Sequence, residues 1–214
     1  MTTTTTHNSV LAEAVLPLTG QAMRVKQIIL VIAGIAALAV AAKIKIPMFP
    51  VPMTMGTFAV LGIGAAYGMR LGLATIIGYM LIGALGFDVF AGSGAVSFKM
   101  SYVMGGTGGY FPGYEYMRGG TGGYLVGYVL AVLALGYAAR QGWDRSIGKM
   151  ALAMVLGNVL IYVPGLVWLA MLYGTDAPIF TWGLTPFLLG DLVKLALAAL
   201  LLPAVWGLVG AARK

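Results

Sequence analysis

The chain of 214 residues is 60% hydrophobic and only 9% charged, and its formal net charge is +7. Charged residues make up about a quarter of an average soluble domain, so this composition predicts an integral membrane protein and leaves no room for a soluble catalytic domain. The absence of cysteine excludes disulfide bonds, thiolate metal sites and cysteine nucleophiles, and a single histidine in a polar segment predicts no metal site.

Residues 1–22 form a Thr-rich segment, which we predict to be a disordered tail ahead of a transmembrane domain over residues 23–214. No basic region precedes its short apolar run, so the segment does not resemble a signal peptide. The rest of the chain predicts six spans of helical length: Val25–Ala42, Thr54–Tyr67, Leu71–Gly86, Thr121–Ala139, Lys149–Tyr173 and Leu184–Val209. The second span is short and turns into the third at Gly68–Gly72. Prolines predict an extended loop after the first span, and a Gly-rich segment over 87–119 follows the third.

Basic residues lie mainly at the ends of these spans. If the N-terminus is cytoplasmic, eight lie inside (Arg24, Lys26, Arg70, Arg140, Arg145, Lys149, Arg213, Lys214) and four outside (Lys43, Lys45, Lys99, Arg118). Cytoplasmic loops carry an excess of Lys and Arg, so we expect an N-in/C-in topology. The predicted fold class is an all-α membrane protein, a bundle of six transmembrane helices in the cell membrane, the bacterial inner membrane. The basic residues form no single patch, so no nucleic-acid partner is predicted.

An acid and a base, Asp191 and Lys194, lie inside the apolar sixth span. Ionisable groups at membrane depth are costly unless they are paired or hydrated, so they indicate a functional site. A spacing of three places both side chains on one helix face. One interpretation is an ion pair that only fixes helices together. The other is a site for a small polar or anionic ligand, which is favoured because buried ion pairs seldom add net stability.

Other polar and aromatic residues are candidates for the same site. The segment Gly-Thr-Gly-Gly-Tyr occurs at 106–110 and again at 120–124, where it leads into the fourth span. Its glycines permit close approach of either a ligand or a neighbouring helix, and Tyr124 offers an aromatic face. Asn158 and Tyr162 lie four residues apart on one face of the fifth span. Asn158 either contacts the ligand or forms a hydrogen bond between helices. Phe90 and Tyr79 are expected to add aromatic walls.

Two further features concern partners. Ala33, Ala37 and Ala41 recur every four residues in the first span and form a stripe of small side chains, which is typical of close helix contacts. The chain contains no phosphate-binding loop, because Gly148-Lys149 is followed by Met150 and lacks the first glycine of that motif. We therefore expect no ATP binding by this chain.

Several segments, in order along the chain, resemble the BioY family, the biotin-binding S components of energy-coupling-factor (ECF) transporters. The matching segments are Val51–Met55, Gly64–Gly72, Gly83–Gly86, Val89–Gly92, Gly120–Gly127, Gly142–Ser146, Leu156–Asn158 and Pro186–Lys194. The chain departs from the pattern of that family at Gly56, Ile82, Asp88 and Leu189.

This resemblance implies an ECF S-component fold that binds biotin near the outer face without catalysis and without a cofactor of its own. It implies docking to a transmembrane T component and to two ATPase subunits, which use the ATP. The matching site positions are Asp191, Lys194, Asn158 and Tyr124, and the alanine stripe matches the surface that faces the T component.

Two alternatives remain open at this point. One is an S component or a stand-alone carrier for another small vitamin-like molecule. The other is an intramembrane enzyme that uses Asp191 or Lys194 as a base and Tyr124 or Tyr162 as an acid.

Overall fold

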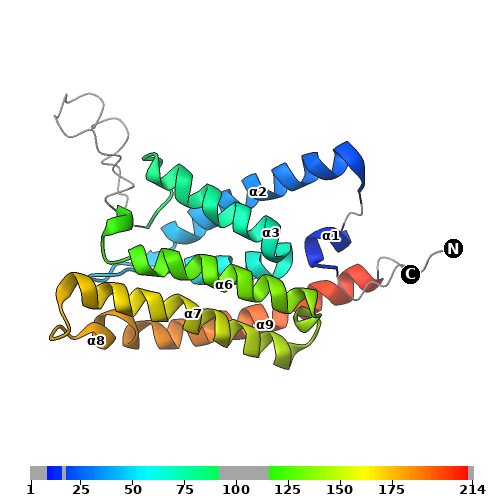
Figure 1. Cartoon of the computed structure of the whole chain (residues 1–214). Coiled ribbons are helices and arrows are strands. Elements are labelled where there is room, and N and C mark those ends of the chain that lie inside the picture. Colours follow the sequence, from blue (N-terminus) through cyan, green and yellow to red (C-terminus); the bar gives the residue numbers. More distant parts are fainter. Residues whose placement is uncertain (1–8, 16–17, 92–115, 212–214) are drawn as a thin grey trace.

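The structure is a computed structural model and describes residues 9–15, 18–91 and 116–211. It is a bundle of helices, with both termini at one end and a small strand pair and α8 at the other (Figure 1). The helices are α1 (Leu11–Val15), α2 (Gly20–Lys43), α3 (Gly56–Ala84), α6 (Gly122–Arg140), α7 (Ile147–Tyr173), α8 (Ile179–Gly183) and α9 (Leu188–Ala211). Short 3₁₀ helices, η2 (Trp143–Arg145) and η3 (Thr185–Phe187), precede α7 and α9.

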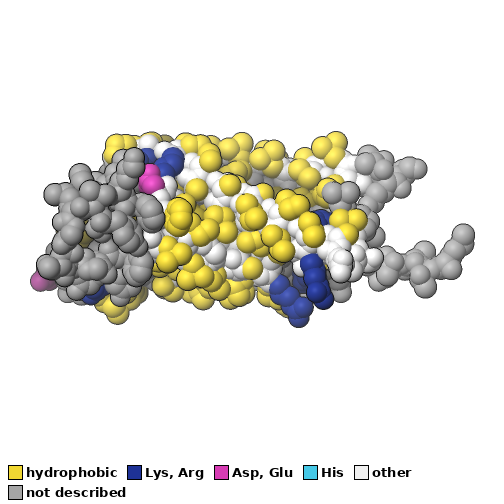
Figure 2. Space-filling model, turned by 90° about the horizontal axis from the view of Figure 1, so that it is seen from above, with side chains coloured by type: hydrophobic (Ala, Val, Ile, Leu, Met, Phe, Trp, Pro, Cys, Tyr) yellow, Lys and Arg dark blue, Asp and Glu magenta, His cyan; other side chains and the backbone are white. Residues whose placement is uncertain are grey.

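Within the described residues, five helical stretches are long and apolar enough to cross a membrane: α2, α3, α6, α7 and the stretch Ile179–Val209 that ends in α9. Figure 2 shows hydrophobic side chains over the middle of one face and Lys or Arg side chains towards its ends. A soluble bundle would place polar groups on this outer surface. The chain is therefore a multi-pass membrane protein.

The longest of these helices, α3, contains a sharp break. Gly68 has a φ of 75°, which a residue without a side chain adopts readily. A Cβ atom on Gly72 would lie 3.7 Å from the Cα of Gly64, whereas residues eight apart in a straight helix are about 12 Å apart. The two parts of α3 therefore fold back on each other, as Figure 1 also shows. The turn predicted at Gly68–Gly72 is confirmed.

Glycines also bring α6 against α7. A Cβ on Gly123 would lie 2.3 Å from the carbonyl oxygen of Pro164, and one on Gly127 would lie 2.6 Å from the Cα of Ile161. No side chain fits at these distances, so Gly123 of the second Gly-Thr-Gly-Gly-Tyr segment and Gly127 just after it serve helix packing, one of the two interpretations above. The first copy, at 106–110, lies outside the described residues.

Two elements differ from the sequence predictions. Residues 11–15 of the predicted disordered tail form α1, where Val10 and Ala14 are buried and Glu13 forms a 2.8 Å ion pair with Arg140. These tertiary contacts order a segment that is too short to be a stable helix alone. The predicted extended loop contains a small antiparallel pair, β1 (Lys45–Ile46) and β2 (Met53–Thr54).

Candidate functional site

The acid and the base of the last span form a buried ion pair. Asp191 and Lys194 lie in the first turns of α9, at 5% and 7% exposure, and the Lys194 Nζ is 2.9 Å from Asp191 Oδ1. The 3₁₀ turn of η3 immediately before α9 contains Pro186, which ends the preceding segment and lets the new helix start there. The spacing of three residues places both side chains on the inner face, as predicted.

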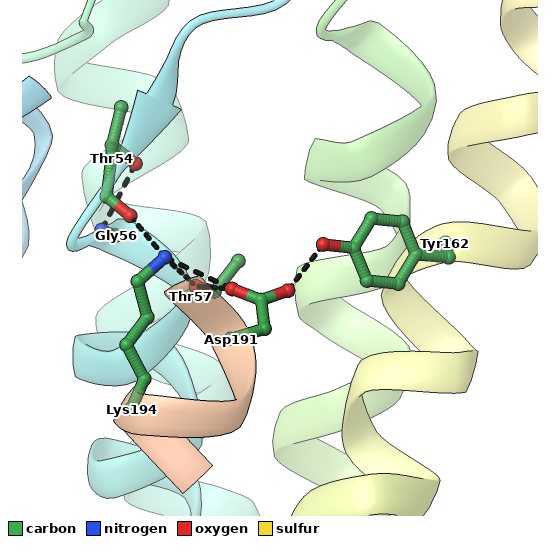
Figure 3. A network of polar contacts seen from close by, with 6 residues as sticks. All are labelled: Thr54, Gly56, Thr57, Tyr162, Asp191 and Lys194. Atoms are coloured by element: carbon green, nitrogen blue, oxygen red, sulfur yellow. Dashed lines mark hydrogen bonds and ion pairs between the residues drawn. The ribbon is translucent and has the colours of Figure 1, made fainter. Parts of the chain in front are cut away.

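A polar network extends from this pair to three other elements (Figure 3). Lys194 Nζ donates to the carbonyl oxygen of Thr54 in β2 at 2.7 Å and to Thr57 Oγ1 in α3 at 3.2 Å. Thr57 in turn donates to Asp191 Oδ1 at 3.4 Å. The hydroxyl of Tyr162 in α7 donates to the other carboxylate oxygen, Asp191 Oδ2. All three protons of the ammonium group thus have acceptors, and both carboxylate oxygens accept hydrogen bonds.

This network forms one wall of a cavity between the helices. Aromatic side chains supply most of the other walls: Tyr79, Phe90, Tyr116, Tyr124, Tyr128, Tyr162 and Phe187. Ala42 at the end of α2 and Thr54 in β2 also line the cavity, which places it towards the end of the bundle opposite the termini (Figure 1). The cavity is lined mainly by apolar and aromatic side chains, with one buried acid and one buried base together in one wall, which suits a small ligand with an apolar body and a polar end.

The aromatic walls are fixed by contacts among themselves and with backbone oxygens. The ring of Phe90 stacks on Tyr116 with centroids 5.0 Å apart and meets the edge of Tyr79 at 5.2 Å. The Tyr79 hydroxyl donates to the carbonyl oxygen of Val89 at 3.1 Å. The Tyr124 hydroxyl donates to the carbonyl oxygen of Gly183 in α8 at 2.8 Å. Tyr79 and Tyr124 therefore present their rings, rather than free hydroxyl groups, to the cavity.

An ion pair holds the segment that carries Phe90. Lys43 Nζ at the end of α2 lies 2.5 Å from Asp88 Oδ1 and donates to the Phe90 carbonyl oxygen at 2.8 Å. Asp88 is one of the positions at which the chain departs from the resembled pattern, and here it has a local structural role.

The structure brings most of the predicted ligand-binding residues together. The cavity is lined by Tyr79, Phe90, Tyr124, Tyr162, Asp191 and Lys194. Asn158 does not line it, and its Oδ1 is buried with no hydrogen-bond partner among the described residues. Sequence reasoning missed Thr54 and Thr57, whose hydroxyl or carbonyl groups contact the ion pair. Both residues lie in the first turn of the predicted span Thr54–Tyr67, and no local pattern indicated their contact with Asp191 and Lys194.

The alanine stripe is divided by the structure. Ala33 and Ala37 are exposed on the outside of α2, whereas Ala41 is buried at 8% exposure. The expectation of one outward stripe of three alanines is therefore wrong for Ala41, because α2 approaches the rest of the bundle near its end, where Ala42 lines the cavity.

In the ranges that the structure describes, no three His, Cys, Asp or Glu side chains come together as ligands.

The comparison with protein families identifies the family. The model of the BioY family matches residues 14–118 and 112–211, which is nearly the whole chain. The chain belongs to the BioY family. A BioY relative from Pyrococcus horikoshii, named "Probable biotin transporter BioY", is 32% identical over 86% of this chain and 99% of its own length. Another from Thermotoga maritima, named "Biotin transporter BioY", is 32% identical over 80% of this chain and 92% of its own.

A solved structure has the same fold as this BioY chain. The crystal structure of the S-component for biotin from an ECF-type ABC transporter superposes with a TM-score of 0.67 at 17% identity, covering 89% of this chain and 95% of the other. At this identity the comparison supports the fold alone. Because BioY proteins belong to a family of transporters, the intramembrane enzyme is no longer an alternative.

Proposed function

We propose that this chain is the S component of an ECF-type transporter and captures biotin for uptake. The observation that carries the proposal is the buried Asp191–Lys194 pair in an aromatic cavity of a BioY-family chain. The names of its relatives, biotin transporters in two organisms, supply the substrate class.

The chemistry of the cavity suits biotin. The ureido ring of biotin has two N–H donors and a carbonyl acceptor, its thiophane ring and valeryl chain are apolar, and its carboxylate favours a cation. The cavity offers the Asp191–Lys194 pair as one polar wall, where a polar end of biotin would bind, and aromatic side chains as the other walls. Tyr162, Thr57 and Thr54 orient both charged groups, and a ligand that bonds to the pair replaces some of these contacts. The cavity has a volume of about 60 Å³, so its side chains must move apart to admit biotin.

We further propose six membrane crossings with both termini in the cytoplasm, in the cell membrane. The break at Gly68 divides α3 into two antiparallel parts, and counting each part as one crossing turns five long helices into six. An even number of crossings keeps the eight basic residues counted above on the cytoplasmic side. The cavity then opens towards the outside, where a nutrient is captured.

Active uptake in this proposal depends on partners. The chain lacks a phosphate-binding loop, so ATP hydrolysis is assigned to two ATPase subunits, and a transmembrane T component couples them to this chain. The exposed alanines Ala33 and Ala37 of α2 offer a flat surface for close helix contact with that T component.

Biotin binding by the detergent-purified protein is the decisive test. Wild type should bind biotin, and Asp191→Asn should weaken binding by roughly 10- to 100-fold, the range expected for losing a charged hydrogen-bond partner. Asp176→Asn, in the exposed loop between α7 and α8, is the matched control and should bind normally. Isothermal titration with biotin, riboflavin and thiamine would measure this. Binding of another vitamin in preference to biotin would favour the alternative S component and contradict the biotin assignment.

A further inference from the structure

A second cavity lies at the other end of the bundle, near the termini (Figure 1). It has a volume of about 400 Å³ and is lined by residues of α1, α2, α3 and α6. The charged residues in its lining are Glu13, Lys26, Arg70 and Arg140. The proposed biotin site uses none of them.

The cavity carries an excess of positive charge. Among the described residues that line it, three are bases, Lys26, Arg70 and Arg140, and one is an acid, Glu13, which forms a 2.8 Å ion pair with Arg140. The lining therefore has a formal net charge of +2. Such a cavity attracts an anion, and the predicted topology places it at the cytoplasmic membrane interface, where anionic lipid headgroups are found.

An apolar groove continues from this cavity along the outside of α2. The groove and the cavity share Gln27 and Leu71. The groove's other lining residues are Arg24, Ile28, Val31 and Ile32. The nine residues from Arg24 to Ile32 cover about 12 Å of helix towards the middle of the bundle. Ile28 and Ile32 are 60% and 61% exposed, so the groove opens to the lipid side.

We propose that this cavity and its groove bind one anionic phospholipid, with the phosphate headgroup between Lys26 and Arg70 and one acyl chain along Ile28, Val31 and Ile32. A soluble anion would use the basic cavity but gain nothing from the groove. A zwitterionic lipid would use the groove but gain little from the charge excess. An anionic phospholipid satisfies both features.

Native mass spectrometry of the full-length protein tests this proposal. The protein is incubated with equimolar phosphatidylglycerol and phosphatidylcholine that have identical acyl chains. Wild type should retain phosphatidylglycerol preferentially. Lys26→Gln with Arg70→Gln should reduce that preference by about fivefold for each charge removed. Lys149→Gln removes an exposed base at the start of α7, outside the cavity, and should leave the preference unchanged.

A second variant tests the groove without changing any charge. Val31→Trp should fill the groove and lower retention of phosphatidylglycerol. Val163 is 57% exposed on α7, outside the groove, so Val163→Trp should leave that retention unchanged. The melting temperature of the Lys26→Gln, Arg70→Gln double variant shows whether that variant folds. If it does not fold, Val31→Trp still tests the proposal.

Three results would overturn the proposal. The first is equal retention of the two lipids by wild type. The second is an equal loss of preference in Lys149→Gln and in the double variant. The third is displacement of phosphatidylglycerol by excess inorganic phosphate together with normal retention by Val31→Trp, which would identify a site for soluble anions.

Discussion

At the scale of single residues, Lys194 connects parts of the chain that are far apart in sequence. Its ammonium group joins Asp191, three residues away, to the carbonyl oxygen of Thr54, 140 residues away. The first contact follows from helical spacing and was predictable. The second was not, because Thr54, the first residue of a predicted span, has no local pattern that identifies its partner. For Asn158, helical spacing was not sufficient to predict a place in the site. The spacing put Asn158 on the same helix face as Tyr162, but of these two residues only Tyr162 lines the cavity.

Tyr162→Phe tests the network around the carboxylate. The variant keeps the ring that lines the cavity but removes the hydroxyl that donates to Asp191. We expect biotin affinity to fall by roughly 10- to 100-fold, because a hydrogen bond to a charged group is lost and the carboxylate is less well oriented. Titration calorimetry would measure this against Tyr137→Phe, a tyrosine of α6 that is 59% exposed. Equal affinity of Tyr162→Phe and wild type would contradict the role assigned to the hydroxyl.

At the scale of elements, the sequence predicted the long spans well because their hydrophobicity reflects the surrounding lipid. It also predicted the turn within α3, since Gly68 begins a Gly-rich stretch that allows a left-handed backbone. It failed for α1, whose order depends on the ion pair between Glu13 and Arg140 and on burial of Ala14. Such contacts depend on tertiary structure and leave no periodic signal in five residues.

Gly127→Ala tests the close contact between α6 and α7. The new methyl group would lie 2.6 Å from the Cα of Ile161, so one helix must move. We expect destabilisation of about 1–3 kcal/mol, the usual cost of overpacking, seen as a lower melting temperature in detergent. Gly207→Ala is the matched control, because no atom lies within 4 Å of its added Cβ. An unchanged melting temperature in Gly127→Ala would show that the contact tolerates a side chain.

At the scale of the whole molecule, the two ends of the bundle have different chemistry. The end with α8 and the strand pair contains the aromatic cavity, and the end with the termini contains the basic one. The exposed part of the alanine stripe, Ala33 and Ala37, lies between them on the outside of α2. Ala33 and Ala37 line neither cavity.

Ala37→Trp tests docking of the T component. A large side chain on this exposed face should prevent close approach of a partner helix and abolish co-purification, while biotin binding stays normal. Val163→Trp places the same side chain on the exposed face of α7 and should co-purify normally. Pull-down with a tagged T component, together with biotin titration, would measure both properties. Normal co-purification of Ala37→Trp would exclude this face, and loss of biotin binding would mean that Ala37 packs within the bundle.

The pairing of one acid with one base also determines how the binding site responds to voltage. Asp191 and Lys194 together carry no net charge, so the electric field across the membrane exerts no net force on them when the site is empty. Biotin adds a single carboxylate. Moving that one charge through the full potential changes its energy by about 2.3 kcal/mol per 100 mV. The contribution of this site to the electrical work of each transport cycle is therefore determined by the charge of the ligand and not by the charge of the protein.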